Sequence, residues 1–276
     1  MRAISGLLIV IVIPAGLHMI EAGDRKMNLI LLETSELDAS GRVRLADHRA
    51  RHIREVLKAE PGRAIRIGVI NGPRGTASVE AVEGHEVDLR CLLETVVPPR
   101  PAMDLLLALP RPKVMRRLWA QLAALGVGRI LLTNAWKVER VYFDTHVLEP
   151  ETYRPLLIEG LQQAQDTRLP EVSIHRQFKV LVEDDLDTLC PSSVRLLADP
   201  GAALRLNELI FPNPEMRVLL AVGPEGGWTD HEKQLLQQHG FQPVGMGSRT
   251  LRTDTACLAL LALVHDRLAC GARRGS

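Results

Sequence analysis

The sequence predicts an α/β protein, with a parallel-sheet domain in its C-terminal half and a small β-rich domain before it. From residue 104 onward, short apolar runs alternate with segments of helical periodicity, which is typical of a parallel sheet with crossover helices. Before residue 95 the pattern is one of strands and turns. Between the two, Pro98-Pro99-Arg100-Pro101 stiffens the chain and cannot continue a strand. We therefore expect domains at residues 27–97 and 102–276.

Residues 1–26 form an apolar N-terminal extension. The stretch from Ala3 to Ile20 is nearly all apolar and follows Arg2, as in a signal peptide or a marginal membrane span, although a span needs roughly 20 apolar residues. Pro14 and His18 weaken the membrane reading, and no convincing cleavage site follows. We expect an over-extended start before Met27 rather than a signal. The alternative is a genuine anchor, which would hold the protein at the inner side of a membrane.

The overall composition gives no global sign of a polyanionic partner, because 34 basic residues balance 33 acidic ones. Any nucleic-acid surface must therefore be local. The cysteines lie far apart and form no Cys-x-x-Cys motif, so neither a zinc site nor a disulfide framework is indicated and no metal is expected. We expect buried thiols in a reducing cytosol. They are Cys91, Cys190, Cys257 and Cys270.

The N-terminal domain is expected to be a small barrel. Apolar alternation predicts strands at residues 29–32, 64–70, 76–82 and 87–93, with a turn at 71–75. One helix, residues 47–59, interrupts the strands and ends at Pro61-Gly62. Its inner stripe would be Ile53, Val56 and Leu57.

Positive charge collects around this helix. The excess over Asp47, Glu55 and Glu60 is of the kind that attracts a phosphate backbone. A solvated helix face is the alternative reading. The basic residues are Arg42, Arg44, Arg49, Arg51, Arg54, Lys58, Arg63 and Arg66, with His48 and His52 alongside.

The C-terminal domain begins with alternating strands and helices. Strands are predicted at residues 104–109, 129–133, 172–174 and 195–200, and helices at 113–125 and 150–165. Gly126 would end the first helix, and the second ends before Leu169-Pro170.

The stretch from residue 217 to 270 organises this domain. The run Val218–Val222 predicts a strand buried on both faces, followed by the loop Gly223-Pro224-Glu225-Gly226-Gly227. Thr229 and Glu232 predict a capping box, and the helix would end at Gly240. A second strand at 241–246, a loop at 247–252 and a helix from Thr253 to about 269 follow. If the two strands are adjacent and parallel, both loops reach the same edge of the sheet, where ligands bind in open α/β folds.

The first loop suits a ligand that is bound by backbone groups of the protein. Its three glycines let the backbone approach a ligand closely. The spacing matches neither a phosphate loop nor a dinucleotide fingerprint. A plain tight turn is the alternative.

The two loops together are more specific. Residues 223–227 and 246–256 closely resemble the C-terminal end of the 16S rRNA (uracil-N3)-methyltransferase family, a branch of the SPOUT methyltransferases. The resemblance covers roughly residues 27–269, and the family's proteins begin where Met27 stands. It implies a deep trefoil knot at about 217–270 around S-adenosylmethionine, a PUA-like RNA-binding barrel at 27–97, a homodimer, and a cytoplasmic enzyme acting on 16S rRNA or the small ribosomal subunit.

The resemblance also implies site residues. Cofactor contacts would come from Asp199, Gly223, Pro224, Gly226, Gly227, Met246, Gly247, Leu251, Thr255 and Ala256. RNA contacts would come from Arg49, Arg51, His52, Arg54, Lys58, Gln163 and Arg168. The chain departs from the family pattern at Ala164 and Asp166, where the family carries Ser and Arg, and also at Gln121 and Ala124. These departures bear on the RNA target more than on the chemistry.

Uracil N3 carries an imide proton and is a poor nucleophile until that proton leaves, so a base and a stabiliser of negative charge are required. Arg252 suits the second role, because its planar fork can reach two oxygens. Glu225 or Asp254 could accept the proton, although Glu225 could simply order its loop and Asp254 could serve as a helix-start carboxylate. Two alternatives remain: a SPOUT enzyme acting on another base or on a ribose, and a non-catalytic RNA-binding protein.

Overall fold

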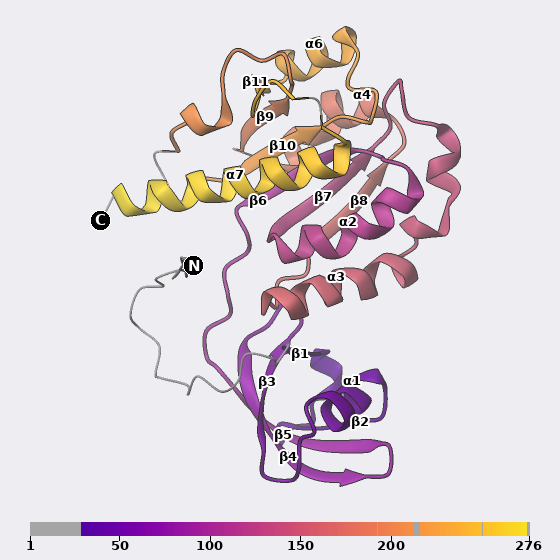
Figure 1. Cartoon of the computed structure of the whole chain (residues 1–276), viewed down its shortest axis with the longest axis vertical. Coiled ribbons are helices and arrows are strands. Elements are labelled where there is room, and N and C mark those ends of the chain that lie inside the picture. Colours follow the sequence, from indigo (N-terminus) through magenta and orange to yellow (C-terminus); the bar gives the residue numbers. More distant parts are fainter. Residues whose placement is uncertain (1–28, 192, 212–215, 250, 275–276) are drawn as a thin grey trace, which may run out of the picture.

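The computed structural model of the chain describes residues 29–191, 193–211, 216–249 and 251–274, so the expected extension at residues 1–26 lies outside the described residues. Two sheets, each with its own hydrophobic core, make up an N-terminal part (residues 29–97) and a C-terminal part (residues 102–274) (Figure 1).

The N-terminal part is a five-stranded sheet in the order β1-β3-β4-β5-β2. Its strands are β1 (Ile30–Leu32), β2 (Arg42–Leu45), β3 (Ala64–Val69), β4 (Arg74–Glu83) and β5 (Glu86–Leu93). Strands β1 and β3 are parallel and the other pairs are antiparallel. The core beneath the sheet is built from one face of each strand and includes Leu32, Ile53, Ile67 and Leu89.

Strand β2 was not among the predicted strands. Val43 and Leu45 are buried, whereas Arg42 and Arg44 point outward, which is the alternation of a half-buried strand. The two arginines pair across the sheet, Arg44 with Asp88 at 2.7 Å and Arg42 with Glu80 at 2.9 Å. Their charge is therefore largely compensated by carboxylates that lie far away in the sequence.

The predicted helix at 47–59 is shorter and partly π-helical, with α1 spanning His48–Arg51 and a π turn spanning His52–Val56. Ile53 and Leu57 are buried as expected. The prediction for Val56 was wrong, because Val56 is 64% exposed. The wider π turn, in which the Leu57 amide donates to the His52 carbonyl, rotates Val56 out of the inner stripe.

The C-terminal part is a six-stranded, fully parallel sheet in the order β11-β9-β10-β6-β7-β8, which confirms the predicted parallel α/β architecture. Its strands are β6 (Met103–Ala108), β7 (Val127–Thr133), β8 (Glu171–His175), β9 (Val194–Ala198), β10 (Val218–Val222) and β11 (Gln242–Val244). Its helices are α2 (Pro112–Ala124), α3 (Pro150–Ala164), α4 (Phe178–Val180), α5 (Leu186–Leu189), α6 (Asp230–Gln238) and α7 (Thr253–Arg274). The helical segment at 178–189 was not predicted.

One feature of the strand order differs from expectation. The two strands that precede the glycine-rich loops, β10 and β11, are not adjacent, because β9 lies between them and pairs with both. The loops still reach one edge of the sheet, since all three strands are parallel. The end of β9, at Asp199, therefore lies in the middle of that edge.

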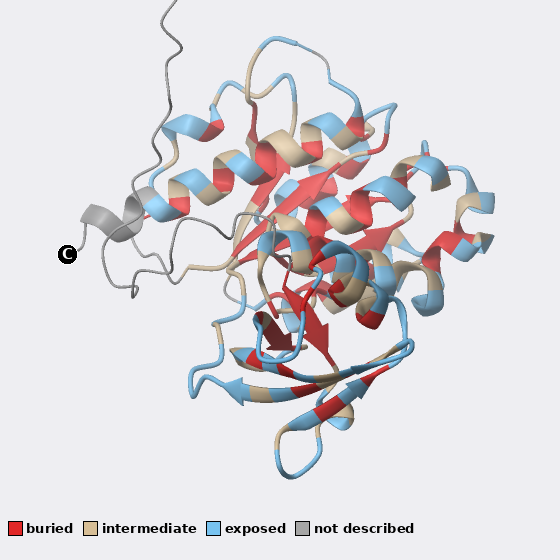
Figure 2. Cartoon of the chain, turned by 60° about the horizontal axis from the view of Figure 1, so that its bottom comes forward, coloured by how far each residue is buried: buried red, intermediate tan, exposed pale blue. Residues whose placement is uncertain are grey.

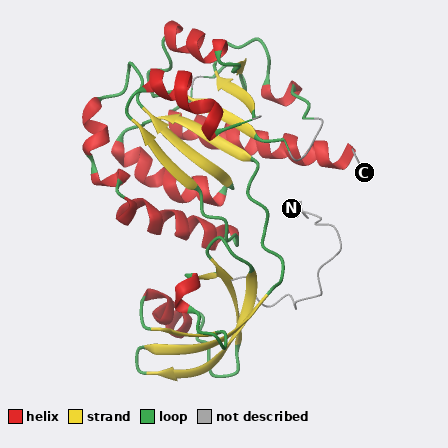
Figure 3. Cartoon of the chain, turned by 180° about the vertical axis from the view of Figure 1, so that it is seen from behind, coloured by secondary structure: helices red, strands yellow, loops and turns green. Residues whose placement is uncertain are grey.

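Helices cover both faces of the C-terminal sheet, and the residues of the strands between them are mostly buried (Figures 2 and 3). Helices α2 and α7 lie on the face that is turned to the viewer in Figure 1, and α3 lies between α2 and the N-terminal part. Helices α2 and α3 pack together at Trp119. Its ring centroid lies 4.9 Å from that of Tyr153 in a tilted arrangement, and its indole N–H donates to the Val147 carbonyl.

The segment between α3 and β8 holds the two parts of the chain together. The Thr167 hydroxyl donates to the Gly72 carbonyl at 2.7 Å, and the Thr167 carbonyl accepts from the Asn71 amide at 2.7 Å. The Arg168 guanidinium donates to the carbonyls of Pro98 and Asn71. Asp166 accepts from the amides of Thr167 and Arg168. Asp166, one of the departures from the family pattern, thus has a structural role at the junction.

A buried ion pair at the start of β6 gives a prediction for stability. Asp104 is 0% exposed and accepts two hydrogen bonds from Arg217, at 2.6 and 3.2 Å. Among the described residues, Arg217→Met would leave this buried carboxylate with two more distant partners, the Arg129 guanidinium at 3.9 Å and the Cys190 thiol at 4.0 Å. We expect a loss of about 3 kcal/mol in the free energy of unfolding, measured by urea denaturation. Arg44→Met, which breaks a surface pair, is the control and should change stability little; equal losses would contradict the argument.

Candidate functional site

A pocket of about 480 Å³ opens at the carboxyl edge of the C-terminal sheet. Its walls come from the ends of β9, β10 and β11 and from the first turns of α7. This volume lies in the range of small-molecule sites, and the position is where open parallel sheets bind ligands. The lining residues are Ala198 to Gly201, Val222 to Trp228, Lys233, Val244 to Gly247, Arg249, Leu251, Thr253, Ala256 and Leu260.

The first glycine-rich loop is shaped by close packing. A Cβ atom on Gly223 would lie 3.0 Å from the indole of Trp228, so only glycine fits without displacing the ring. Trp228 in turn stacks on Phe178 at 5.3 Å between ring centroids. Gly227 has φ of 68°, a conformation that glycine adopts without strain. The glycines therefore let the loop pack against Trp228 on one side and line the pocket on the other.

The predicted capping box at the start of α6 is confirmed and fixes this loop. The Glu232 carboxylate accepts from the Thr229 amide at 2.7 Å, and the Thr229 hydroxyl accepts from the Glu232 amide at 3.3 Å. Glu232 also accepts from the Trp136 amide at 2.7 Å, which ties the loop after β7 to the same carboxylate. Lys137 adds a hydrogen bond from its ammonium to the Gly226 carbonyl at 2.6 Å.

The second loop closes the opposite wall. Gly247 has φ of 149°, which a residue with a side chain rarely adopts. Apart from its chain neighbours, no described residue has an atom within 4 Å of the Cβ it lacks. The Thr253 hydroxyl at the start of α7 donates to the Gly223 carbonyl at 3.4 Å. The two loops are therefore joined directly at the base of the pocket.

The pocket contains an ion pair that sequence reasoning missed. Lys233 of α6 donates to Asp199 at 2.9 Å, and the Gly201 amide donates to the same carboxylate at 3.0 Å. Burial raises the pKa of Asp199, but these two hydrogen bonds outweigh burial and hold the pKa below its ordinary value of 3.8. No local pattern marks Lys233, because its partner lies 34 positions away.

The depressed pKa of Asp199 gives a pH-dependent prediction. The ion pair contributes stability above the unfolded-state pKa and loses it as the pH falls through the folded-state pKa, because protonation removes the charge. Lys233→Met should therefore lower the free energy of unfolding by about 1 kcal/mol at pH 7. The difference from the parent should shrink below about pH 4 in urea titrations. A difference independent of pH would mean that Lys233 acts through packing alone.

The structure brings nine of the ten predicted cofactor residues to the pocket wall, the exception being Thr255. Of the three predicted catalytic residues, only Glu225 lines the pocket. Its carboxylate is exposed and accepts from the Arg111 amide at 3.4 Å. Arg252 is exposed at the end of the second loop. Asp254 is engaged by Arg117 at 3.0 Å and by the Thr255 amide, as expected of a helix-start carboxylate.

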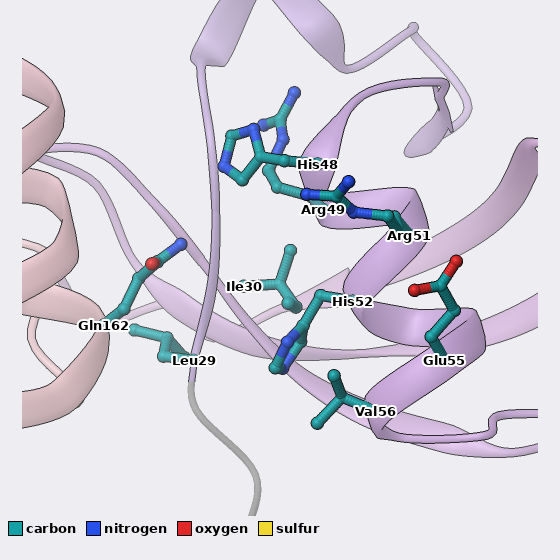
Figure 4. Close-up of a pocket in the computed structure, with 9 residues that line it drawn as sticks. All are labelled: Leu29, Ile30, His48, Arg49, Arg51, His52, Glu55, Val56 and Gln162. Atoms are coloured by element: carbon teal, nitrogen blue, oxygen red, sulfur yellow. The ribbon is translucent and has the colours of Figure 1, made fainter.

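Three of the predicted RNA-binding residues, Arg49, Arg51 and His52, line a second pocket of about 300 Å³ between α1 and α3 (Figure 4). In this view the side chains of His48 and Gln162 point toward one another across strand β1. The Arg49 guanidinium already has protein partners, because it pairs with Glu36 and Asp47 and donates to the Leu31 carbonyl. The bond from Arg49 lowers the pKa of Glu36.

The other predicted RNA-binding residues are spread along the junction and the helix end. Arg54 lies 3.9 Å from Glu55, and Lys58 is exposed with φ of 47°. Gln163 is exposed on α3 and contacts Glu159 at 3.5 Å. The Arg168 guanidinium is occupied at the junction. Arg51 and Lys58 therefore present the most accessible positive charge in this predicted set.

Over residues 29–191, 193–211, 216–249 and 251–274, no helix has the length and apolar character needed to cross a membrane. In the same ranges, no three His, Cys, Asp or Glu side chains gather where they could hold a metal ion. Cys190 and Cys257 are buried free thiols as predicted, Cys91 is half-buried, and the side chain of Cys270 lies outside the described residues.

Comparison with known proteins matches residues 98–265 to a family profile described as an RNA methyltransferase domain. The ribosomal RNA small subunit methyltransferase E of Treponema pallidum is 31% identical over 248 residues, which are 86% of this chain and 90% of that protein. A protein named ribosomal RNA small subunit methyltransferase E 1 in Borreliella burgdorferi is 24% identical, covering 88% of this chain and 99% of its own length.

Solved structures share the fold. A ribosomal RNA small subunit methyltransferase E from Neisseria gonorrhoeae, bound to S-adenosyl methionine, superimposes with a TM-score of 0.70 at 24% identity, over 87% of this chain and 97% of that chain. A probable rRNA methyltransferase from Porphyromonas gingivalis gives a TM-score of 0.68 at 22% identity, covering 88% and 99% of the two chains.

Proposed function

The chain belongs to the RNA methyltransferase family that includes the small-subunit ribosomal RNA methyltransferases E, and from this premise we propose that it transfers a methyl group from S-adenosylmethionine to N3 of a uridine in 16S rRNA. The observation that carries the proposal is the pocket of about 480 Å³ at the carboxyl edge of β9, β10 and β11, because glycines of both loops line it.

The pocket fits this cofactor by shape and by charge. Its volume suits a nucleoside joined to an amino acid, and Val222, Val244 and Leu260 supply apolar surface for a base. Asp199 and Glu225 bring negative charge, whereas Lys233 and Arg249 bring positive charge. A ligand with a sulfonium, an ammonium and a carboxylate needs both signs in its site. When bound, S-adenosylmethionine supplies a methyl carbon that is open to attack by a nucleophile.

Residues of this chain would then position the uridine, accept the N3 proton and stabilise the negative charge on the base. Positioning N3 in line with the methyl group can supply about 7–11 kcal/mol of the barrier reduction. Arg252, at the exposed end of the second loop, would stabilise the negative charge that spreads onto the flanking carbonyl oxygens. Glu225 is the better proton acceptor of the two candidates, because it lines the pocket and is exposed, whereas Asp254 is engaged by Arg117.

The remaining features of the proposal concern architecture. We assign the N-terminal part (residues 27–97) as a PUA-like RNA-binding barrel and residues 102–276 as a SPOUT domain with a trefoil knot at about 217–270. The insertion of β9 between β10 and β11 supports a non-sequential path at this end of the chain. We further assign a homodimer and a cytoplasmic location. The exposed Arg51 and Lys58 would contact the rRNA or the small ribosomal subunit.

The test is methyl transfer from labelled S-adenosylmethionine to small ribosomal subunits from cells that lack this gene, followed by nucleoside analysis. Label recovered as 3-methyluridine is the expected result. Label on another nucleoside or on a ribose would replace the uridine assignment and keep the reaction class. No transfer despite cofactor binding by calorimetry would point to another RNA, and no cofactor binding would favour a non-catalytic RNA-binding protein.

A further inference from the structure

One tryptophan of this chain stands in solvent. Trp136 is 84% exposed, whereas Trp119 and Trp228 are buried. The chain is poor in aromatic residues, at 3% of the sequence, so an exposed indole is unusual here. Large aromatic side chains left in water commonly mark a contact surface.

The turn that carries Trp136 is firmly held. Its amide donates to the buried Glu232 at 2.7 Å, and the neighbouring Lys137 ammonium donates to the Gly226 carbonyl at 2.6 Å. On either side of these two residues, Ala135 and Val138 are buried, and the Val138 amide donates to the Ala135 carbonyl. The indole is thus mounted on a fixed turn.

Trp136 also lies at the edge of the sheet where the cofactor pocket opens. It follows β7, and its turn contacts the loop after β10 through Gly226, a pocket residue. The loop after β6 reaches the same place, because the Arg111 amide donates to Glu225. Trp136 itself does not line the pocket, but its turn is joined to the pocket wall at Gly226.

The charges around the indole suit a polyanion. Lys137, Arg140 and Arg111 are exposed, and Lys137 donates to a carbonyl, with no ion pair to a carboxylate among the residues that the structure describes. Of the carboxylates that follow in the chain, Asp144 pairs with Arg176 at 2.9 Å, whereas Glu139 accepts from the neutral Tyr142 hydroxyl at 2.9 Å and keeps its charge. An aromatic plane flanked by cations is the usual surface for unpaired bases of single-stranded RNA.

We propose that Trp136 is a substrate-binding residue that stacks on an unpaired base of the RNA next to the methylated nucleotide. This inference rests on the proposed function and deepens it. Stacking would hold the strand across the pocket mouth and so bring the target base toward the methyl group. A second copy of the chain is the competing occupant, but the exposed Lys137 and Arg140, one and four positions after the indole in the chain, favour a polyanion.

The experiment uses the fluorescence of the full chain and an unstructured RNA of 12 nucleotides. Acrylamide, a neutral quencher, should reach Trp136 and spare the two buried tryptophans. We expect the RNA to protect the accessible fraction of the fluorescence from quenching. Trp136→Ala should raise the Kd for the RNA at least about fivefold, and Trp136→Phe should restore it to within about threefold. Calorimetry should show the same cofactor affinity in all three proteins.

Several results would overturn the inference. Unchanged RNA affinity in Trp136→Ala, with cofactor binding and 3-methyluridine formation retained, would remove the stacking role and leave the proposed function standing. Protection of the indole that grows with protein concentration without RNA would assign the surface to a second copy. Absence of RNA binding and of methyl transfer in the parent protein would end both proposals.

Discussion

Replacing Arg252 by alanine is expected to lower the rate of methyl transfer at least about a hundredfold while leaving the Kd for S-adenosylmethionine within about threefold. The physical reason is that the arginine does not line the cofactor pocket but lies exposed at the end of the second loop, where we propose that it meets the RNA base. Its loss would remove charge stabilisation in the transition state and little ground-state binding of the cofactor. Single-turnover transfer to small subunits and calorimetry with the cofactor measure the two quantities separately.

Arg249 offers a matched control for this experiment. It lies on the same loop but lines the pocket, so Arg249→Ala should weaken cofactor binding first. Full turnover by Arg252→Ala would remove Arg252 from the mechanism. Equal loss of cofactor affinity in the two variants would instead show that both act by shaping the loop.

Gly160→Ala is expected to destabilise the protein by about 3 kcal/mol, although alanine is normally the better helix former by about 1 kcal/mol. Gly160 lies in α3 where this helix crosses α2. A Cβ atom built there would lie 2.0 Å from the Ala120 carbonyl oxygen and 2.8 Å from its carbonyl carbon. Because these are backbone atoms, the clash can be relieved only by moving one helix away from the other.

Urea unfolding of Gly160→Ala measures this cost, and Gln163→Ala provides the control on the exposed face of the same helix. The control should be neutral or slightly stabilising. If Gly160→Ala were as stable as the parent, the two helices would have to separate at little cost, and the close crossing would not be a determinant of the fold.

Local patterns in the sequence were enough to predict most elements and the outline of the site. The buried run at Val218–Val222, the capping box at Thr229 and Glu232, and the loops with Gly223 and Gly247 were all predicted and are present. These features depend on the preferences of neighbouring residues, such as apolar periodicity, a side chain that caps its own helix, and a glycine that adopts a positive φ. Such preferences act within a few positions of the chain.

Other features could not be predicted because they depend on residues that meet only in the folded chain. The charge of Arg44 was counted toward an RNA-binding patch, but Asp88 pairs with it from another strand. Val56 was expected inside, but a π turn rotates it into solvent. In both cases the sequence near the residue is compatible with either outcome, and the packing of distant segments decides.

The sequence by itself determined that this chain has a parallel sheet, two glycine-rich loops and a family resemblance carried by those loops. Only the tertiary structure decided that β9 separates β10 and β11, and that Lys233 joins Asp199 in the pocket. It also decided that Trp136 stands beside the pocket mouth on a turn held by Glu232. The physical reason is that strand order and ion pairs arise from contacts across tens of residues, and no local preference of the chain encodes them.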